Sequence, residues 1–190
     1  DWSSDVCSSD LSAKLLKYCI DNRHWSVFEQ VSVTMEINTT RDISHQIIRH
    51  RSFSFQEFSQ RYADPTKDMA FVTREARLQD AKNRQNSIET DDEDLERWWI
   101  HSQEWITSQA QIEYKKAIDR GIAKEQARAV LPEGLTISRL YMNGTLRSWI
   151  HFIELRSANG TQKEHQEVAL ACAQAIAQIF PMATELVAKD

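Results

Sequence analysis

The run R-H-R-S-F-S-F-Q-E-F-S-Q-R-Y occupies residues 49–62 and is the most informative stretch of the chain. It holds three arginines and one histidine, interleaved with Phe53, Phe55 and Phe58. Guanidinium groups bind an anion through forked hydrogen bonds, and aromatic rings bury a flat heterocycle. The stretch therefore predicts a phosphate site of the kind that holds a nucleotide.

Each arginine taken singly could instead be solvated or paired with the surplus acids. The 190-residue chain has 28 acidic and 23 basic residues and a formal net charge of −5. An acidic chain with a local arginine cluster favours a focused anion site over a surface that grips nucleic acid along its length. Around Ser59 no Ser-His-acid arrangement is legible, so a serine nucleophile is not predicted.

The bulk properties predict one soluble domain. No apolar run approaches the length of about 18 residues that a membrane span needs, and no signal peptide is visible. The cysteines, Cys7, Cys19 and Cys172, are odd in number and scattered, which suits a reducing cytoplasm. The histidines His24, His50 and His151 lie far apart without ligand spacing, so we expect no metal site. Because there is no long apolar run, we also expect no membrane contact.

The first ten residues, D-W-S-S-D-V-C-S-S-D, are polar and without period. We expect residues 1–10 to be disordered or foreign, and residues 11–190 to form the domain. Apolar periodicity predicts helices over residues 11–21, about 95–121, 122–131, 146–155 and 161–180. The last of these has a predicted capping box at Thr161 and Glu164. The tryptophans of the long helix, Trp98, Trp99 and Trp105, are expected in the core or at a subunit interface.

Strict alternation over residues 31–37 predicts a strand with one buried face. Thr39 or Thr40 can cap a following helix that carries Gln46, Arg49 and His50 near its C-terminal end. Residues 53–55 read as extended, 69–72 as a short strand, and the charged stretch 74–94 as a solvated helix plus loop. The sum is an α+β domain, helix-rich with a small antiparallel sheet.

Five segments resemble the flavin-dependent thymidylate synthase family and occur along the chain in the family's order. One of them is the signature itself, R-H-R followed by seven residues and S-x-R, at 49–61. The others are H-W-S-V-F-E-Q at 24–30, E-Q-A-R-A-V-L-P at 125–132, N-G-T-L-R-S at 143–148 continuing to residues 151 and 155–156, and T-Q-K-E at 161–164. The resemblance spans roughly residues 15–181 and departs from the commoner pattern at Gln30, Ser52, Gln56 and His151. The family's N-terminal strand, which contributes to the flavin site, is expected to be missing.

The resemblance implies the family's reaction, which makes dTMP from dUMP by reductive methylation. Methylenetetrahydrofolate gives the carbon, and FAD reduced by NADPH gives the hydride. It also implies a homotetramer with active sites shared between subunits. Two alternatives stay open: a non-catalytic module that binds nucleotides or nucleic acid, and a family member inactivated by truncation.

The resemblance also implies roles for particular residues. The dUMP site would contain Gln46, Arg49, Glu57, Phe58, Ser59, Gln60, Arg61, Arg128 and Arg156. FAD would be held by Ser26, Glu29, His50, Arg51, Ser52, Asn143, Arg147 and His151. Arg156 would be catalytic, because a fixed cation beside the uracil stabilises negative charge that develops on the ring. Glu29 and Glu57 could form a general acid/base pair, but we favour hydrogen bonding to flavin and substrate.

Overall fold

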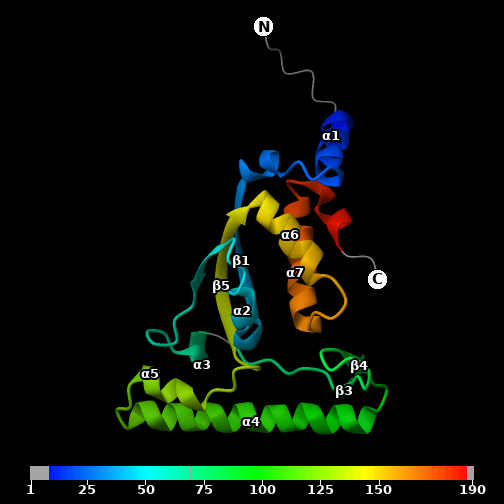
Figure 1. Ribbon diagram of the computed structural model, residues 1–190. Coiled ribbons are helices and arrows are strands. Elements are labelled where there is room, and N and C mark those ends of the chain that lie inside the picture. The colour runs from blue at the N-terminus through cyan, green and yellow to red at the C-terminus, as the bar shows by residue number, and fades with distance from the viewer. Residues whose placement is uncertain (1–8, 69, 188–190) are drawn as a thin grey trace.

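A computed structural model describes residues 9–68 and 70–187 of the chain. Its centre is an antiparallel sheet in the order β1-β5-β2, formed by Ser32–Thr40, Ile137–Thr145 and Ser54–Glu57. The helices α2 (Arg41–Ile47), α6 (Leu146–Arg156) and α7 (Lys163–Ala177) pack with this sheet, and α4 (Glu93–Asp119) runs across its lower end in Figure 1. The α+β class predicted from the sequence is confirmed.

The remaining elements are short, apart from the first helix. They are α1 (Ser9–Asp21), η1 (Trp25–Glu29), α3 (Pro65–Asp68), β3 (Arg77–Gln79), β4 (Ser87–Glu89), α5 (Lys124–Ala127), η2 (Arg128–Val130) and η3 (Pro181–Leu186). None of the helices in the described part of the chain is long and apolar enough to cross a membrane.

The core lies between the sheet and helices α2, α6 and α7. Strand β5 buries every second residue, including Leu140 and Met142, and α6 buries Trp149, Phe152 and Ile153 completely. These two elements are consecutive in sequence, so one short stretch supplies both layers. Burial of large apolar side chains stabilises by about 1.5–3 kcal/mol each, so this junction contributes substantially to the stability of the core.

Strand β5 comes very close to the arginine-rich stretch at Gly144. The Phe53 ring lies directly over Gly144, where an added Cβ would approach its Cδ1 to 2.4 Å and its Cε1 to 2.6 Å. The ring is itself confined, because it packs edge-on against Trp149 at a centroid distance of 4.9 Å. Gly144 is therefore required for packing, and Phe53 anchors residues 49–52 to the sheet.

Several elements agree with the predictions from sequence. The predicted strand over 31–37 lies largely within β1, the long helix is α4, and α6 covers the predicted 146–155. Residues 1–8 of the predicted N-terminal segment lie outside the described residues, and α1 begins at Ser9 rather than at residue 11. Of the predicted strand over 69–72, Met69 is also outside, and Phe71 forms a single bridge with Thr136.

Three predictions were wrong or incomplete. The stretch 74–94 contains the β3–β4 hairpin, not a helix, because Arg77 and Glu89 are tied to Glu164 and Lys163 of α7. The predicted capping box does not form: the N-cap of α7 is Gln162, without a side-chain cap bond. Strand β5, which no prediction included, is the central strand of the sheet. The prediction of core or subunit interface for the tryptophans is narrowed to the interface for Trp98 and Trp105, because they are 61% and 67% exposed.

We expect Gly144→Ala to destabilise the protein by about 1–3 kcal/mol, because the methyl group forces the confined Phe53 ring out of place. Chemical denaturation measures the change. Gly134→Ala is the matched control, since the nearest atom to its added Cβ, Asp42 Oδ2, lies at an ordinary 3.7 Å. Equal losses in the two variants would contradict the packing assigned to Gly144.

Candidate functional site

The three residues R-H-R follow α2 in successive turns rather than continuing the helix. Helix α2 ends at Ile47, the His50 amide donates to the Ile47 carbonyl at 3.0 Å, and the Phe53 amide donates to the His50 carbonyl at 3.4 Å. Burial of Phe53 fixes the far end of this turn. As a result Arg49 and Arg51 are exposed while His50, between them, faces the interior.

The centre of the site is a hydrogen bond between Arg156, the last residue of α6, and His50. The Arg156 Nε donates to His50 Nε2 at 2.8 Å. The imidazole packs edge-on against Phe152, with centroids 5.1 Å apart, and against Phe53 at 6.4 Å. Burial, then Arg156 and then His151, lower the pKa of His50 from 6.5 to about 4. At neutral pH the ring is therefore uncharged, and its Nε2 lone pair accepts from the guanidinium.

Arg49 and Arg156 lie near enough to repel each other. Burial, and second the charge of Arg49, lower the pKa of Arg156, although an arginine stays protonated. Among the described residues no carboxylate forms an ion pair with Arg49, Arg51 or Arg156. Like charges held together without a counter-ion, in a chain with surplus acids, make an anion site.

Most of the residues predicted to hold FAD lie near this turn, at the start of β2. Ser54 pairs with Asn143, and Ser148 Oγ donates to the Ser52 carbonyl at 3.3 Å. Arg147 NH1 donates to Glu29 Oε1 at 2.6 Å, which joins α6 to η1. The Arg147 bond, ahead of one from Thr145, lowers the pKa of Glu29, so this carboxyl is ionised. Ser26 lies on η1 beside Glu29, and His151 is near enough to His50 to help lower its pKa.

A second group of predicted residues lies past the other end of β2. Arg61 forms an ion pair with Glu125 at 3.2 Å, and Arg128 Nε donates to the Glu125 carbonyl at 3.2 Å. Gln60 is only 4% exposed, and its Nε2 has no hydrogen-bond partner in the described part of the chain. The Ser59 carbonyl accepts from two following amides and so shapes the turn.

Glu57 lies at the end of β2, between the two groups. Its Oε1 accepts from Ser138 Oγ at 2.7 Å and Ser44 Oγ at 3.0 Å, and it lies 3.6 Å from Arg41 NH1. Phe58, the next residue, donates its amide to the Arg139 carbonyl at 2.8 Å. These three neighbouring side chains hold the Glu57 carboxylate in one position.

The two groups are separated by the length of β2. Its four residues span about 10–14 Å at the usual rise of about 3.3 Å per residue. We define the first group as the His50 group, with Gln46, Arg49, His50, Arg51 and Arg156, and the second as the Arg61 group, with Ser59, Gln60, Arg61 and Arg128. Within the described residues no hydrogen bond or ion pair connects them. The structure brings together the members of each group but not the two groups.

The sequence reasoning missed His165, whose ring is fully buried beside Gln46 and whose Nδ1 lies 3.3 Å from Gln46 Oε1. No pattern signalled it, because the two residues are 119 positions apart. Gln162, which accepts a hydrogen bond from Gln46 at 2.8 Å, belongs to the T-Q-K-E segment that resembles the family, but it was not predicted to contact another site residue.

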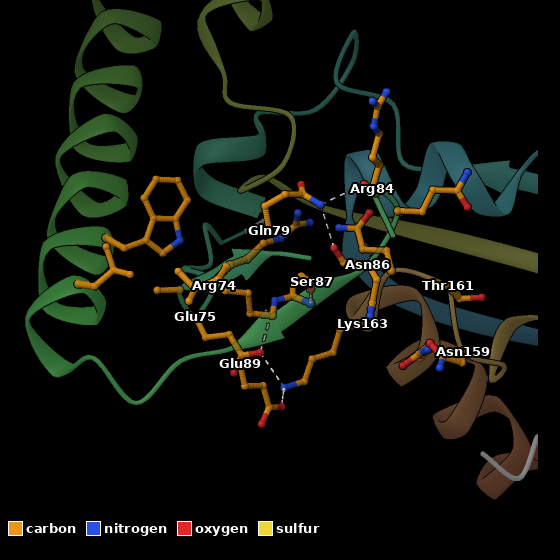
Figure 2. Close-up of a pocket in the computed structure, with 18 of the residues that line it drawn as sticks. Arg74, Glu75, Gln79, Arg84, Asn86, Ser87, Glu89, Asn159, Thr161 and Lys163 are labelled. Atoms are coloured by element: carbon orange, nitrogen blue, oxygen red, sulfur yellow. Dashed lines mark hydrogen bonds and ion pairs between the residues drawn. The ribbon is translucent and has the colours of Figure 1, made fainter. Parts of the chain in front are cut away.

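A cavity of about 1000 Å³ lies between the β3–β4 hairpin, α4 and the start of α7 (Figure 2). Lys163 connects the start of α7 to the hairpin beside this cavity, with Nζ 2.7 Å from Glu75 Oε1 and 2.8 Å from Glu89 Oε1. None of the residues predicted to bind dUMP or FAD lines this cavity. It adjoins the His50 group at Gln162, which binds Gln46, and at Ser157, which follows Arg156.

The sequence and the fold both match known proteins. A family model described as thymidylate synthase complementing protein matches residues 2–182. The probable flavin-dependent thymidylate synthase of Paramecium bursaria Chlorella virus 1 is 51% identical over 167 residues, which cover 88% of this chain and 76% of the relative. The flavin-dependent thymidylate synthase of Synechocystis sp. is 49% identical over 168 residues, with coverages of 88% and 76%.

A solved structure agrees with these sequence relatives. The UMP/dUMP methylase PolB from Streptomyces cacaoi, bound with 5-Br dUMP, is similar with a TM-score of 0.79 and 28% identity. The similarity covers 96% of this chain and 82% of that chain.

The neutral state of His50 predicts a pH dependence of stability. Its pKa of about 4 in the folded protein lies below the ordinary 6.5, so the unfolded chain takes up the proton first on acidification. The contribution of neutral His50 is therefore complete above about pH 6.5 and is lost as the pH falls towards 4. We expect the free energy of unfolding to fall more steeply over this range in the wild type than in His50→Gln, which still accepts from Arg156 but does not titrate. Parallel curves from denaturation at each pH would contradict a buried, neutral His50.

Proposed function

The chain belongs to the flavin-dependent thymidylate synthase family, and on this premise we propose that it makes dTMP from dUMP by reductive methylation. In this proposal methylenetetrahydrofolate gives the carbon, and FAD reduced by NADPH gives the hydride. Residues 11–190 act as one catalytic domain.

The observation that carries the proposal is the set of arginines of the His50 group. Arg49, Arg51 and Arg156 are close in the fold and none has a carboxylate partner among the described residues, while Arg156 is oriented by a neutral imidazole. A neutral acceptor fixes the guanidinium and leaves its charge uncompensated. Such a cation stabilises an anionic pyrimidine without reorganising during the reaction. This supports Arg156 as the catalytic residue beside the uracil.

The residues near the start of β2 fit FAD by the chemistry of their donors. A pyrophosphate needs cations and hydrogen-bond donors, and a ring system needs donors to its carbonyl groups. Arg51 has no ion-pair partner in the described part of the chain, and Ser26, Ser52, Asn143, Arg147 and His151 add further donors near it. Glu29 holds Arg147 in place. When bound and reduced, the flavin supplies the hydride.

The Arg61 group supplies a second cationic centre, suited to the phosphate of dUMP. Arg61 and Arg128 converge on Glu125 and are both solvent-accessible. Glu57 to Gln60 lie beside them and offer hydroxyl, amide and carboxylate groups to the nucleotide. The two groups of one chain lie at opposite ends of β2, and in this proposal each dUMP site takes one group from each of two subunits.

The surface of α4 supports assembly into a homotetramer with shared sites. Trp98, Trp105, Ile106 and Ile112 are all more than 40% exposed on this one helix. An apolar helix face of this kind is typical of subunit contacts. Helix α4 also packs against η2, which carries Arg128, so it borders the Arg61 group.

The buried thiols fit a flavin reaction better than attack by cysteine on the uracil. Cys19 and Cys172 are buried, and burial raises the pKa of Cys172 to about 12. A protonated, inaccessible thiol is a poor nucleophile. Cys7 lies outside the described residues.

Ligand binding tests the proposal directly. We expect the purified protein to carry FAD and dUMP to perturb the absorption spectrum of the bound flavin, because both ligands are held by neighbouring residues. A protein that stays colourless on FAD titration but binds dUMP would favour the non-catalytic nucleotide module.

Mixed oligomers test the shared site. Arg128→Ala removes a charge-assisted bond worth about 1.5–3 kcal/mol, and Arg156→Ala removes the catalytic cation, so each variant alone should be nearly inactive. Coexpressed with random pairing, they should regain activity in about a quarter of sites, since those sites draw both intact groups from different subunits. Mixing Arg156→Ala with Arg49→Ala is the control and should restore nothing, because both changes lie in the His50 group. Equal behaviour of the two mixtures would contradict sharing.

A further inference from the structure

The side-chain amide of Gln46 is held from both ends by the start of α7. Its Nε2 donates to Gln162 Oε1 at 2.8 Å, and its Oε1 lies 3.3 Å from His165 Nδ1. Gln46 is on α2, directly before the arginine-rich turn, so these bonds connect two helices at the edge of the His50 group. Either amide orientation could be drawn for Gln46 considered alone, and its partners decide which is correct.

The hydrogen bonds continue from Gln162 to a carboxylate, which fixes the direction of the whole chain. Gln162 Nε2 donates to Glu164 Oε2 at 2.8 Å, and Arg77 of β3 binds the other oxygen, Oε1. An ionised carboxylate only accepts, so Gln162 must turn its nitrogen to Glu164 and its oxygen to Gln46. Gln46 must then turn its nitrogen to Gln162 and its oxygen to His165. The last acceptor therefore requires a proton on His165 Nδ1.

The surroundings of His165 agree with that tautomer. The residue is fully buried, and its Nε2 has no hydrogen-bond partner among the described residues. Its ring neighbours are Phe152, at a centroid distance of 5.9 Å, and His50, at 6.4 Å. A bare lone pair costs less in such a place than a buried N–H without an acceptor. Burial, then Arg156 and then His50, lower the pKa of His165 to about 4, so the ring is neutral and carries one proton.

We propose that His165, Gln162, Glu164 and Arg77 form a positioning relay that fixes the Gln46 amide in one orientation for contact with the pyrimidine. The inference rests on the proposed function, because it takes Gln46 as a dUMP contact. The relay uses one hydrogen of the Gln46 Nε2 and leaves the second available for an acceptor such as a uracil carbonyl. Arg77 ends the relay on the β3–β4 hairpin, which makes the hairpin part of the support of the site.

A purely structural role is the competing interpretation. In that case the bonds only hold α7 against α2, and any loss of dUMP affinity follows the loss of stability. The relay differs from it because it depends on a donor at the position of His165 Nδ1 and on the charge at Arg77. Neither requirement is a matter of side-chain volume.

Two variants of His165 separate these interpretations. His165→Leu fills the space without a donor, and His165→Asn offers an amide N–H at the same distance along the side chain. We expect His165→Leu to weaken dUMP binding to the holoenzyme about 5- to 10-fold, the effect of one lost hydrogen bond. His165→Asn should restore affinity to within about 2-fold of wild type, even if its melting temperature is no higher than that of His165→Leu. Affinity that follows melting temperature in both variants would overturn the relay.

The hairpin end has its own matched pair. Arg77→Gln removes the nearer of the two cations at Glu164 and leaves Arg74, whose Nε is 4.0 Å from Glu164 Oε1. Arg84→Gln changes an exposed arginine on the same hairpin that makes no ion pair within the described residues. Weakened dUMP binding in Arg77→Gln alone supports the relay, and equal effects in the two variants would contradict it.

A readout independent of dUMP keeps the inference separate from the proposed function. Nitrogen-15 NMR of the His165 ring should show the proton on Nδ1 and a bare Nε2 at neutral pH. A proton on Nε2 would overturn the relay whatever the protein binds. If wild-type protein does not bind dUMP at all, the proposed function fails, and the observed tautomer alone decides whether the hydrogen-bond chain runs as described.

Discussion

The pairing of β5 with a strand on each side is the constraint on which the rest of this structure depends. β5 holds β1 along one edge and β2 along the other, and it continues without a loop into α6. The β2 pairing sets where the arginine-rich turn begins and where the Arg61 group begins. The continuation into α6 places Arg147 near the first turn of that helix and Arg156 at its last. A shift of this strand by one residue would move every candidate functional side chain.

The electrostatics of the site follow from what surrounds the cations rather than from their number. Most arginines elsewhere in the described chain meet carboxylates, as Arg74 meets Asp42 and Arg139 meets Glu36. An exposed pair such as that of Arg139 and Glu36 contributes little to stability, about 0–1 kcal/mol. Arg156 instead meets a neutral imidazole in an aromatic setting. A second neutral histidine, His165, lies beside both His50 and Phe152 and connects to Gln46. The site thus keeps its positive charge available because its closest partners are uncharged.

The sequence predicted those parts of the fold whose signals are local. Alternation over 31–37 indicated β1, and the apolar periodicity from about residue 95 to Gly121 indicated α4. β5 was missed because its buried positions include Ser138 and Gly144 beside Leu140 and Met142, so apolar residues do not alternate cleanly. The hairpin was missed because Leu78 and Ile88 stay half exposed, and the bonds that hold it reach α7, more than 70 residues away.

For the site, the sequence supplied candidate residues but not their grouping. The resemblance to the family named Arg49, Arg61, Arg128 and Arg156 together, yet the fold separates them into two pairs at opposite ends of β2. That separation depends on strand register, which no single segment reveals. The role assigned to His165 depends on a contact across 119 positions and on hydrogen-bond direction, neither of which leaves a pattern in the sequence.

The central claim is that this chain converts dUMP to dTMP with a hydride taken from its flavin, and a single-turnover experiment tests it most directly. Enzyme whose FAD has been reduced by NADPH, freed of excess NADPH and kept without oxygen, is mixed with dUMP and methylenetetrahydrofolate. Flavin absorbance and dTMP are followed together. We expect one dTMP for each flavin reoxidised, with tetrahydrofolate as the folate product. Formation of dTMP while the flavin stays reduced, or flavin reoxidation without dTMP, would contradict the claim.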